Sequence, residues 1–521
     1  MPELGLFPPS RITPKGKVVV VGTFQGFQGT DNVLVQDSTV KSYWDELIDY
    51  PIEQKPDGTL IPNLATSWTV SGDQSTWVFA IQDGMIFHNG SPVTAEDVAW
   101  TWNRAIFGLE GEGAIGGWGI ELSTQVSSIS TAGNTVLVKT PEPNGLIPTL
   151  FTSFTGSHGA VALSKSYFEA VGLEEFRDKF VGTGPYSLER RVPGQFVELK
   201  ANEDHFRKAP GFETVQVWDV GELTTRIAML RVGQADLSLA SLQTAQDLRD
   251  AGFNVVTAPG SNVSWMLFHH ADVPGNPFGD KRVREALITS IDRAGIANAL
   301  YLGLAEPANQ AIAVPGNLGY NLDLEEIPYD LDRARQLLAD AGWSDLRVKI
   351  RTFDSDADFP DMPTMSEAIT GGWEEIGVTA TINVMETRAS FDFMSLGAKD
   401  AEVKSKQVED EPPYTLFIRG TDTRFHTFRF MDIWFHSEGR FGMMQQPDLF
   451  DVRLDEMRLA FTLEEQDQGL QDFQQFLTDE FWQAPLLRAG TVFGMSDRIA
   501  EWQPTVGRPL LNNLWTLRPA Q

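Results

Sequence analysis

The 521-residue chain contains no cysteine. Disulfides, thiolate metal sites and cysteine nucleophiles are therefore excluded. Positive charge is also scarce, because 41 lysines and arginines stand against 71 aspartates and glutamates, for a formal net charge of −30 at pH 7. This balance argues against a nucleic-acid partner and against binding to an anionic membrane. No apolar run approaches the roughly 20 residues that span a membrane as a helix.

The rest of the composition is typical of a folded protein, with 42% hydrophobic and 21% charged residues. One core rarely grows beyond roughly 250–300 residues, so the length predicts two or three domains or lobes. Helical and strand patterns alternate through most of the chain, which predicts the α/β class. Strands are predicted at 17–24, 76–81, 135–140, 196–199, 215–218, 255–256, 263–269, 348–350, 378–384 and 492–493, and helices at 94–107, 222–232, 280–300, from 330, 362–376 and 464–481.

The strongest local pattern lies between Met85 and Val98. An apolar-aromatic strand ends in an Asn-Gly pair, which favours a tight turn. A helix then begins at Thr94, whose hydroxyl can cap the first amides, and Glu96 and Asp97 place negative charge at its N-terminus. His88, inside this stretch, is expected to be structural.

This stretch is one of six ordered motifs with a common resemblance. The six are LIPNLATSW (60–68), TAEDV (94–98), GTGPY (182–186), TRIAMLRVGQAD (225–236), PFGDKRVREAL with IDR (277–293) and YD through LLADAGW (329–343). Together they resemble the motifs of the family 5 extracytoplasmic solute-binding proteins of ABC importers, which include peptide, nickel and oligosaccharide receptors. The resemblance extends over nearly the whole chain.

The resemblance implies a two-lobed α/β periplasmic-binding-protein fold, the venus flytrap, with an extra subdomain in lobe I. The expected layout is lobe I from 1 to 44, its inserted subdomain from 45 to 180, lobe I again from 181 to 262, lobe II from 263 to 485, and a return to lobe I from 486 to 521. Crossing strands at 259–268 and 485–491 would form the hinges.

Patterns for catalysis and metal binding fail on inspection. The GEGAIG run at 111–116 follows a helix instead of a strand, so the context of a dinucleotide site is absent. The acidic run at 354–358 starts like a calcium loop, but Phe359 and Met365 stand where glycine and glutamate are required. His269 and His270 are adjacent, and on a strand they would point to opposite faces. No catalytic residue, metal site or cofactor is predicted.

The resemblance also implies where a ligand would be held. Lobe I residues follow the first strand, aromatic and basic residues lie on the crossing strands, and lobe II contributes strand ends and the stretch from 414 to 426. The candidate ligand-binding residues are Phe24, Gln25, Phe27, Trp265, Phe268, Glu386, Arg419, Thr421, Asp422, Arg424, Arg488 and Phe493.

The stretch from 414 to 426 leaves the ligand class open. The peptide receptors that the chain resembles carry an aromatic-glycine segment here, with an aspartate for the peptide ammonium group. This chain lacks that pattern, and Asp422 is the candidate substitute. Arg419 and Arg424 instead suit carboxylate, phosphate or polyhydroxyl groups. Fourteen tryptophans offer faces for stacking on sugars or apolar groups, so short peptides and oligosaccharides both stay open.

The expected function is the substrate-binding component of an ABC importer, which captures a solute between two lobes and delivers it to a cognate permease and ATPase. The expected partners are the solute and these membrane subunits, with no nucleic acid, and the receptor is expected to be a monomer. The alternatives are a glycoside hydrolase-type enzyme, for which no carboxylate pair stands out, and a sensory or chaperone-like receptor with the same fold.

The expected location is outside the cytoplasm, either in the periplasm or attached to the outer face of the cytoplasmic membrane. The first six residues, MPELGL, lack a basic region and a continuous apolar core. Either the protein is cytosolic, or the sequence is a mature or trimmed chain from which a signal segment is absent. The family resemblance, and not the terminus, implies the second.

Overall fold

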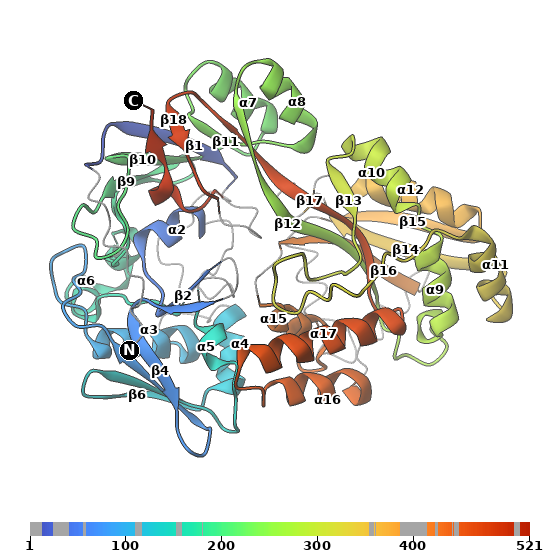
Figure 1. Ribbon diagram of the computed structural model, residues 1–521, viewed down its shortest axis with the longest axis horizontal. Helices are drawn as coiled ribbons and strands as arrows, with labels where there is room; N and C mark the ends of the chain where they lie inside the picture. Colours follow the sequence, from blue (N-terminus) through green and yellow to red (C-terminus); the bar gives the residue numbers. More distant parts are fainter. Residues whose placement is uncertain are drawn as a thin grey trace. The chain divides into compact units, whose positions relative to one another are not determined.

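The computed structural model describes residues 13–23, 41–55, 59–109, 117–152, 159–179, 181–353, 359, 361–385, 414–422, 426–439, 441, 447–504 and 511–520 (Figure 1). The chain divides into two compact units. Unit 1 comprises Met1–Thr257, Val492–Thr505 and Leu510–Gln521, and unit 2 comprises Ala258–Thr491 and Val506–Pro509.

Unit 1 contains a mixed sheet built around the first apolar run of the sequence. β1 (Lys17–Gly22) lies between β10 (Thr214–Asp219) and β11 (Leu237–Leu239) and is parallel to both. β9 (Phe196–Ala201) and β8 (Tyr186–Val192) continue the sheet in antiparallel pairing. The helices α2 (Lys41–Leu47), α7 (Leu223–Arg231) and α8 (Leu242–Asp250) belong to the same unit.

A second, antiparallel sheet in unit 1 carries the motif at 85–98. Its strand order is β4 (Ala65–Val70), β5 (Thr76–Ile81), β7 (Thr135–Lys139) and β6 (Ser128–Ala132). Its neighbours in the chain are α3 (Ala95–Phe107), α4 (Gly117–Gln125), α5 (Ile147–Leu150), α6 (Lys165–Asp178) and the pair β2 (Ile52–Gln54) and β3 (Leu60–Pro62).

The predicted helix start at Thr94 is confirmed. The Thr94 hydroxyl accepts a hydrogen bond from the Asp97 amide, and the Asp97 carboxylate accepts one from the Thr94 amide, which makes a capping box. Trp102 on α3 is fully buried and packs edge-on against Phe79 of β5, with ring centroids 5.3 Å apart. The cap therefore starts a helix whose inner face completes the core of the subdomain.

The strands of unit 2 belong to the same hydrogen-bonded sheet as β1. β14 (Leu346–Phe353) lies between β15 (Val378–Met385) and β16 (Tyr414–Asp422) and is parallel to both, and α12 (Met362–Glu374) connects β14 to β15. The other elements are η2 (Pro277–Gly279), α9 (Lys281–Thr289), α10 (Arg293–Tyr301), β13 (Ala305–Pro307), α11 (Leu331–Asp340), α15 (Phe428–Phe435), α16 (Pro447–Met457) and α17 (Leu463–Asp479).

Two strands take part in both units. β12 (Asn254–Phe268) passes the division after Thr257, and β17 (Ala484–Met495) passes it after Thr491. The strand order of the shared sheet is β15-β14-β16-β12-β17-β11-β1-β10-β9-β8. The strands expected at 255–256 and 263–269 are confirmed as far as Phe268, but they form one continuous strand, because extended backbone continues between them. The φ angle of a proline is compatible with extended backbone, so Pro259 does not interrupt the strand. The lobe boundaries at 262/263 and 485/486 stay predictions.

The expected continuous helix at 280–300 was also wrong. α9 ends at Thr289 and α10 begins at Arg293, because Asp292 caps a new helix by accepting a hydrogen bond from the Gly295 amide at 2.8 Å. The apolar spacing runs through both helices, and it led to the prediction of a single helix. Asp292, a typical N-cap residue, indicated the start of a second helix.

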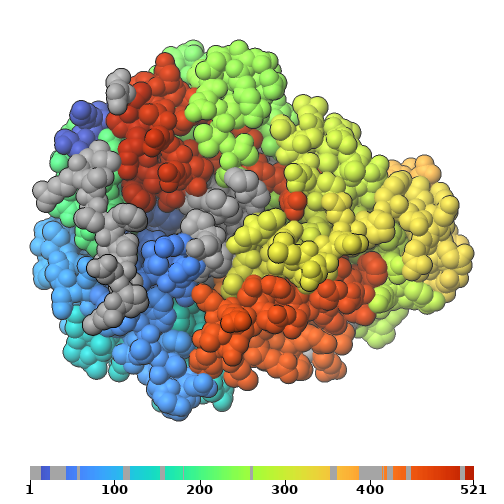
Figure 2. Space-filling view, in the orientation of Figure 1, coloured from blue at the N-terminus to red at the C-terminus, as the bar shows by residue number. Residues whose placement is uncertain are grey.

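The chain ends within unit 1. After β17 come β18 (Ile499–Glu501), η3 (Leu514–Thr516) and β19 (Arg518–Pro519). In the space-filling view the red C-terminal segment covers part of the surface of unit 1 (Figure 2).

Candidate ligand-binding site

β16 is paired differently along its two edges. It pairs with β12 in antiparallel fashion from Leu416 to Asp422, but it pairs with β14 only from Tyr414 to Phe417. Within the described residues, the segment 418–422 therefore has a strand partner on one side only. On the β14 side, beyond the last residue that pairs with β14, the backbone N–H and C=O groups of β16 can form hydrogen bonds with another extended chain.

Two buried polar side chains flank this one-sided segment. Trp265 of β12 lies directly opposite Arg419, and Thr352 follows Arg351, the last residue of β14 that pairs with β16. Both side chains are buried, and in the described part of the chain neither the Trp265 Nε1 nor the Thr352 Oγ1 has a hydrogen-bond partner. A buried donor without an acceptor costs about 1–3 kcal/mol, so such groups call for a functional or structural reason.

The remaining aromatic candidates lie in packed surroundings. Phe268 is fully buried, with its ring centroid 5.2 Å from that of Phe278. Phe493 is also fully buried and packs edge-on against Trp502 at 4.8 Å, within unit 1. Ligand contact by Trp265, Phe268 and Phe493 stays a prediction.

Arg488 lies on the part of β17 that belongs to unit 2, opposite Glu306 of β13. Its Nε and Nη2 donate to the same carboxylate oxygen of Glu306, at 3.1 Å and 2.9 Å, and its Nη1 lies 3.5 Å from the Tyr320 hydroxyl. The Glu306 side chain is 67% exposed, so this is a surface ion pair that solvent screens. Contact between Arg488 and ligand also stays a prediction.

The other candidates are only partly described or not described. Arg419, Thr421 and Asp422 are placed as strand backbone in β16. Five lie outside the described residues, namely Phe24, Gln25, Phe27, Glu386 and Arg424.

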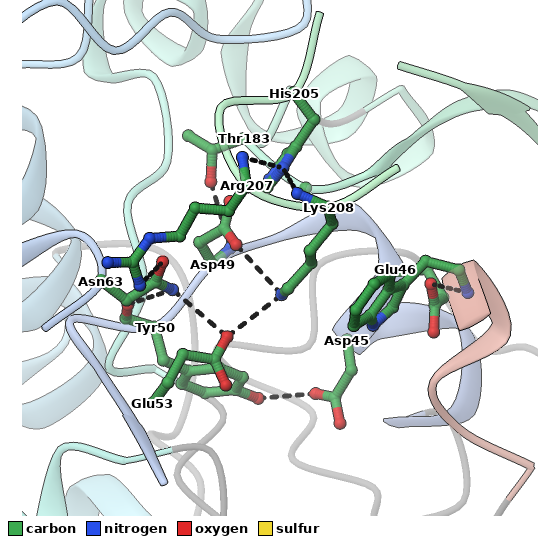
Figure 3. Close-up of polar contacts among 12 residues, drawn as sticks. Asp45, Glu46, Asp49, Tyr50, Glu53, Asn63, Thr183, His205, Arg207 and Lys208 are labelled. Atoms are coloured by element: carbon green, nitrogen blue, oxygen red, sulfur yellow. Dashed lines mark hydrogen bonds and ion pairs between the residues drawn. The ribbon is translucent and has the colours of Figure 1, made fainter. Parts of the chain in front are cut away.

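Unit 1 holds a buried ionic cluster that the sequence did not suggest (Figure 3). Asp49, just after α2, is fully buried and accepts hydrogen bonds from His205 Nε2 at 3.0 Å and from Lys208 Nζ at 3.2 Å. Lys208 also pairs with Glu53 at 3.1 Å. Burial alone would raise the pKa of Asp49, but Lys208 and His205 hold that pKa well below its usual value.

Glu46 joins this cluster to the C-terminal tail. Its two carboxyl oxygens accept hydrogen bonds from the backbone amides of Leu514 at 2.6 Å and Trp515 at 3.0 Å, at the start of η3. Burial raises the pKa of Glu46 to about 8, although Lys208 and the Leu514 amide act in the opposite direction. The arrangement fastens the tail to the interior of unit 1.

His88 connects two of the sequence motifs. Its Nε2 lies 3.0 Å from the Gly184 carbonyl oxygen, and its backbone amide donates to the Gly182 carbonyl at 2.9 Å. Burial lowers the pKa of His88 to about 4, so the ring is neutral at pH 7 and donates to the carbonyl. These contacts bear out the structural role expected of His88.

The sequence suggested that His269 and His270 lie on a strand, but they do not. They follow the end of β12, His270 has a φ of 54°, and the two ring centroids are 3.6 Å apart. Among the described residues no group of three or more histidines, aspartates or glutamates is arranged to hold a metal ion. In the same residues, no helix combines the length and the apolar character needed to cross a bilayer.

Comparison with known proteins decides the family. The family model described as bacterial extracellular solute-binding proteins, family 5 middle, matches residues 59–441. The chain belongs to the family 5 bacterial extracellular solute-binding proteins. This confirms the family to which the six motifs pointed.

The curated relatives of the chain are distant. A putative ABC transporter peptide-binding protein of Brucella ovis is 27% identical over 329 residues, covering 61% of this chain and 59% of that protein. The dipeptide-binding protein of Escherichia coli is 25% identical over 373 residues, covering 67% of each chain. Heme-binding protein A of Haemophilus influenzae is 25% identical and covers 66% of each chain. The match thus spans less than two thirds of the Brucella protein.

Solved structures match the fold over almost the whole chain. DppA from Helicobacter pylori, in complex with the peptide STSA, superposes with a TM-score of 0.76 at 20% identity, covering 97% of this chain and 98% of that one. NikA from Brucella suis, in complex with Fe(III)-EDTA, gives 0.79 at 16% identity, covering 97% and 100%. The expected α/β, two-lobed periplasmic-binding-protein fold is confirmed.

Proposed function

We propose that the chain is the substrate-binding component of an ABC importer and that its solute is a short peptide. It would act outside the cytoplasm as a receptor and not as an enzyme, handing the peptide to a membrane permease driven by an ATPase. Membership of family 5 supports the receptor role. The relatives are named for peptides, dipeptides and heme, so the family alone does not select the solute.

The observation that carries the peptide assignment is the one-sided segment 418–422 of β16. A peptide presents N–H and C=O groups at the spacing of a strand, so it can pair with such an edge through its backbone. An oligosaccharide presents hydroxyl groups without that alternation. Backbone pairing also supplies affinity that does not depend on the side chains of the peptide.

The proposed mechanism is a shift of population. A two-lobed receptor samples open and closed arrangements, and a ligand that contacts both lobes favours the closed one. The permease would distinguish the loaded from the empty receptor by this shift, which is limited by the difference in affinity between the two states. The energy for transport would come from the ATPase partner.

Thermal unfolding with matched ligands tests the assignment. The panel contains a tripeptide, the same tripeptide methylated on its backbone nitrogens, and an oligosaccharide of similar size. A ligand at one hundred times its dissociation constant adds about 2.7 kcal/mol of stability. We expect the tripeptide to raise the unfolding midpoint and the methylated tripeptide to raise it much less, because a methyl group replaces each backbone donor that would pair with the strand edge.

A rise with the oligosaccharide and none with any peptide would overturn the peptide assignment. Equal rises with both tripeptides would keep the peptide as solute but remove backbone pairing at β16 as the reason. Binding of either class without turnover, followed by chromatography of the recovered ligand, separates a receptor from a glycoside hydrolase.

A further inference from the structure

The strand β17 changes from unit 2 to unit 1 over very few residues. In unit 2 it pairs with β13 as far as Ala489. In unit 1 the Val492 carbonyl accepts a hydrogen bond from the Ala240 amide at 2.9 Å, and the next residue of the strand pairs with β11. Gly490 and Thr491 lie between these anchored positions. Because glycine has no side chain to restrict its backbone angles, a bend of β17 costs least here.

The other connecting strand, β12, is a neighbour of β17 in the sheet, and the two run side by side in Figure 1. β12 pairs with β16 from Asn262 to Phe268, so Asn262 is anchored in unit 2 soon after the division that follows Thr257. Thr491 is the last residue of β17 in the same unit. Each of these two polar residues therefore lies near the point where its strand changes unit.

A hydrogen bond between side chains joins the two residues. The Asn262 Nδ2 donates to the Thr491 Oγ1 at 3.1 Å, and the residues are 3% and 8% exposed. Ser264 adds a second connection, because its buried hydroxyl donates to the Leu487 carbonyl at 3.2 Å and accepts from the Leu487 amide at 3.1 Å. Burial strengthens such bonds, because solvent does not screen them. Side chains thus hold β12 and β17 together in unit 2 up to the residue at which β17 leaves it.

We propose that Asn262 and Thr491 form a hinge latch, a side-chain bond that makes β12 and β17 bend together when the receptor closes. With the latch, the two strands turn as one hinge. Without it, each strand can bend separately, and the ligand-free chain gains arrangements that do not lead to closure. Both are then positioning residues, which set the fraction of the receptor that is competent to close without touching the solute.

The inference rests on the proposed receptor function but not on the class of solute. The apparent dissociation constant equals the intrinsic constant divided by the competent fraction, so loss of the latch weakens the binding of every solute by the same factor. The net contribution of one hydrogen bond corresponds to a factor of about five. A residue that touched the solute would instead change the affinities of different solutes to different extents.

Pulsed electron paramagnetic resonance of the ligand-free chain tests the latch. The chain has no cysteine, so Thr225→Cys on α7 and Ala339→Cys on α11, both at exposed positions, place one spin label on each unit without competing sites. We expect Thr491→Val, which removes the hydroxyl but keeps the shape of the side chain, to broaden the distribution of distances between the labels. Thr491→Ser keeps the hydroxyl and should give the distribution of the parent.

Thr289→Val is the matched control. Thr289 is a buried threonine on α9 of unit 2, and its hydroxyl donates to the Glu285 carbonyl at 2.8 Å, so the variant loses a comparable bond outside the connecting strands. Circular dichroism shows whether the variants fold, and Asn262→Ala breaks the latch from the other strand if Thr491→Val does not. Parental distributions in the folded latch variants would overturn the proposal, and so would equal broadening by Thr289→Val.

Isothermal titration with trialanine measures the effect on binding. We expect Thr491→Val and Asn262→Ala each to raise the dissociation constant about fivefold, and the double variant to raise it no further, because both remove the same bond. Additive effects would mean that the two residues act separately and would overturn the latch. Failure of the parent to bind trialanine would count against the proposed peptide receptor and not against the latch, which the label distances decide.

Discussion

Two sets of buried polar groups, one around Asp49 in unit 1 and one beside β16 in unit 2, differ in their hydrogen bonding. Around Asp49 in unit 1, carboxylates face a histidine and a lysine within 3.2 Å. Beside β16 in unit 2, the Trp265 indole and the Thr352 hydroxyl are buried without a hydrogen-bond partner among the described residues. The paired groups around Asp49 stabilise the fold. The unpaired Trp265 indole and Thr352 hydroxyl do not add hydrogen bonds to it.

This difference in pairing is a difference in free energy. A buried charge is tolerated only when partners replace the water it has lost, so the cluster around Asp49 is stable as a set. An unpaired buried donor destabilises the protein, so the two groups beside β16 call for a functional or structural reason. Four sets of substitutions test this difference between paired and unpaired groups, from the largest to the smallest expected effect on stability.

The largest effect is expected for Asp49→Asn. The change removes the negative charge between His205 and Lys208, which leaves a buried cation with a single carboxylate partner. Loss of one member of a buried ion pair costs about 3–5 kcal/mol. Urea unfolding measures this loss.

Glu96→Gln is the control for Asp49→Asn, because it breaks an exposed pair with Lys165 in the same unit and should change the midpoint little. Peptide affinity of the folded Asp49→Asn protein should equal that of the parent. If Asp49→Asn and the parent have the same free energy of unfolding, the ionic cluster around Asp49 does not stabilise this region.

The next effect is a pH dependence carried by Glu46. The pKa of its carboxyl is raised from 4.5 in its ordinary state to about 8 in the folded state. Between these values the folded chain holds a proton that the unfolded chain has lost, so this group makes the free energy of unfolding fall as pH rises towards 8. Glu46→Gln should remove that part of the slope.

Urea unfolding of the parent and of Glu46→Gln between about pH 5 and pH 9 measures the slope. The difference in stability between the two proteins should change with pH below about 8 and become constant above it. Parallel curves over the whole range would mean that Glu46 titrates with its ordinary pKa, despite its burial beside η3.

The local patterns of the sequence were sufficient for much of the fold. The strand at 76–81 and the helix start capped by the Thr94 hydroxyl were predicted correctly because each depends on residues close together in the chain. The helix predicted at 280–300 was wrong in its continuity, because the apolar spacing runs on through the new helix cap at Asp292. The two strands predicted at 255–256 and 263–269 are one strand that ends at Phe268. Family motifs supplied the two-lobed architecture, which periodicity alone does not specify.

The cluster around Asp49 could not have been found in the same way. Asp49 and His205 are 156 residues apart, and Glu46 and Leu514 are 468 apart, so no spacing in the sequence relates them. The one-sided pairing of β16 within the described residues could not be found from spacing either, because it depends on where β14 stops pairing with β16, at Phe417. Candidates named from the motifs, such as Trp265 and Arg488, stay predictions until a ligand is bound.

A smaller effect compares two buried tryptophans in unit 2. The Trp373 indole donates to the Leu287 carbonyl at 3.0 Å, whereas the Trp265 indole has no acceptor among the described residues. Trp373→Phe and Trp265→Phe remove the same side-chain volume, but only Trp373→Phe breaks a hydrogen bond. We therefore expect Trp373→Phe to cost about 1 kcal/mol more in urea unfolding.

Peptide binding should reverse this order. If the ligand completes the Trp265 indole, Trp265→Phe weakens binding by about 1 kcal/mol and Trp373→Phe leaves it unchanged. Isothermal titration with the tripeptide measures both. Equal affinities in the two variants would assign the unpaired indole to packing against Trp434, whose ring centroid lies 5.4 Å away.

The smallest effect on stability is expected at the exposed pair of Arg488 and Glu306. Glu306→Gln should cost under about 1 kcal/mol, because solvent screens a pair in which the carboxylate is 67% exposed. The same exposure means that a ligand carboxylate can replace Glu306 at little cost. Arg488→Gln should then weaken binding of a tripeptide with a free C-terminal carboxylate and leave binding of the amidated tripeptide unchanged, whereas Glu306→Gln should weaken neither. If Arg488→Gln binds both peptides as the parent does, Arg488 is a structural residue, like those around Asp49, and does not contact the ligand.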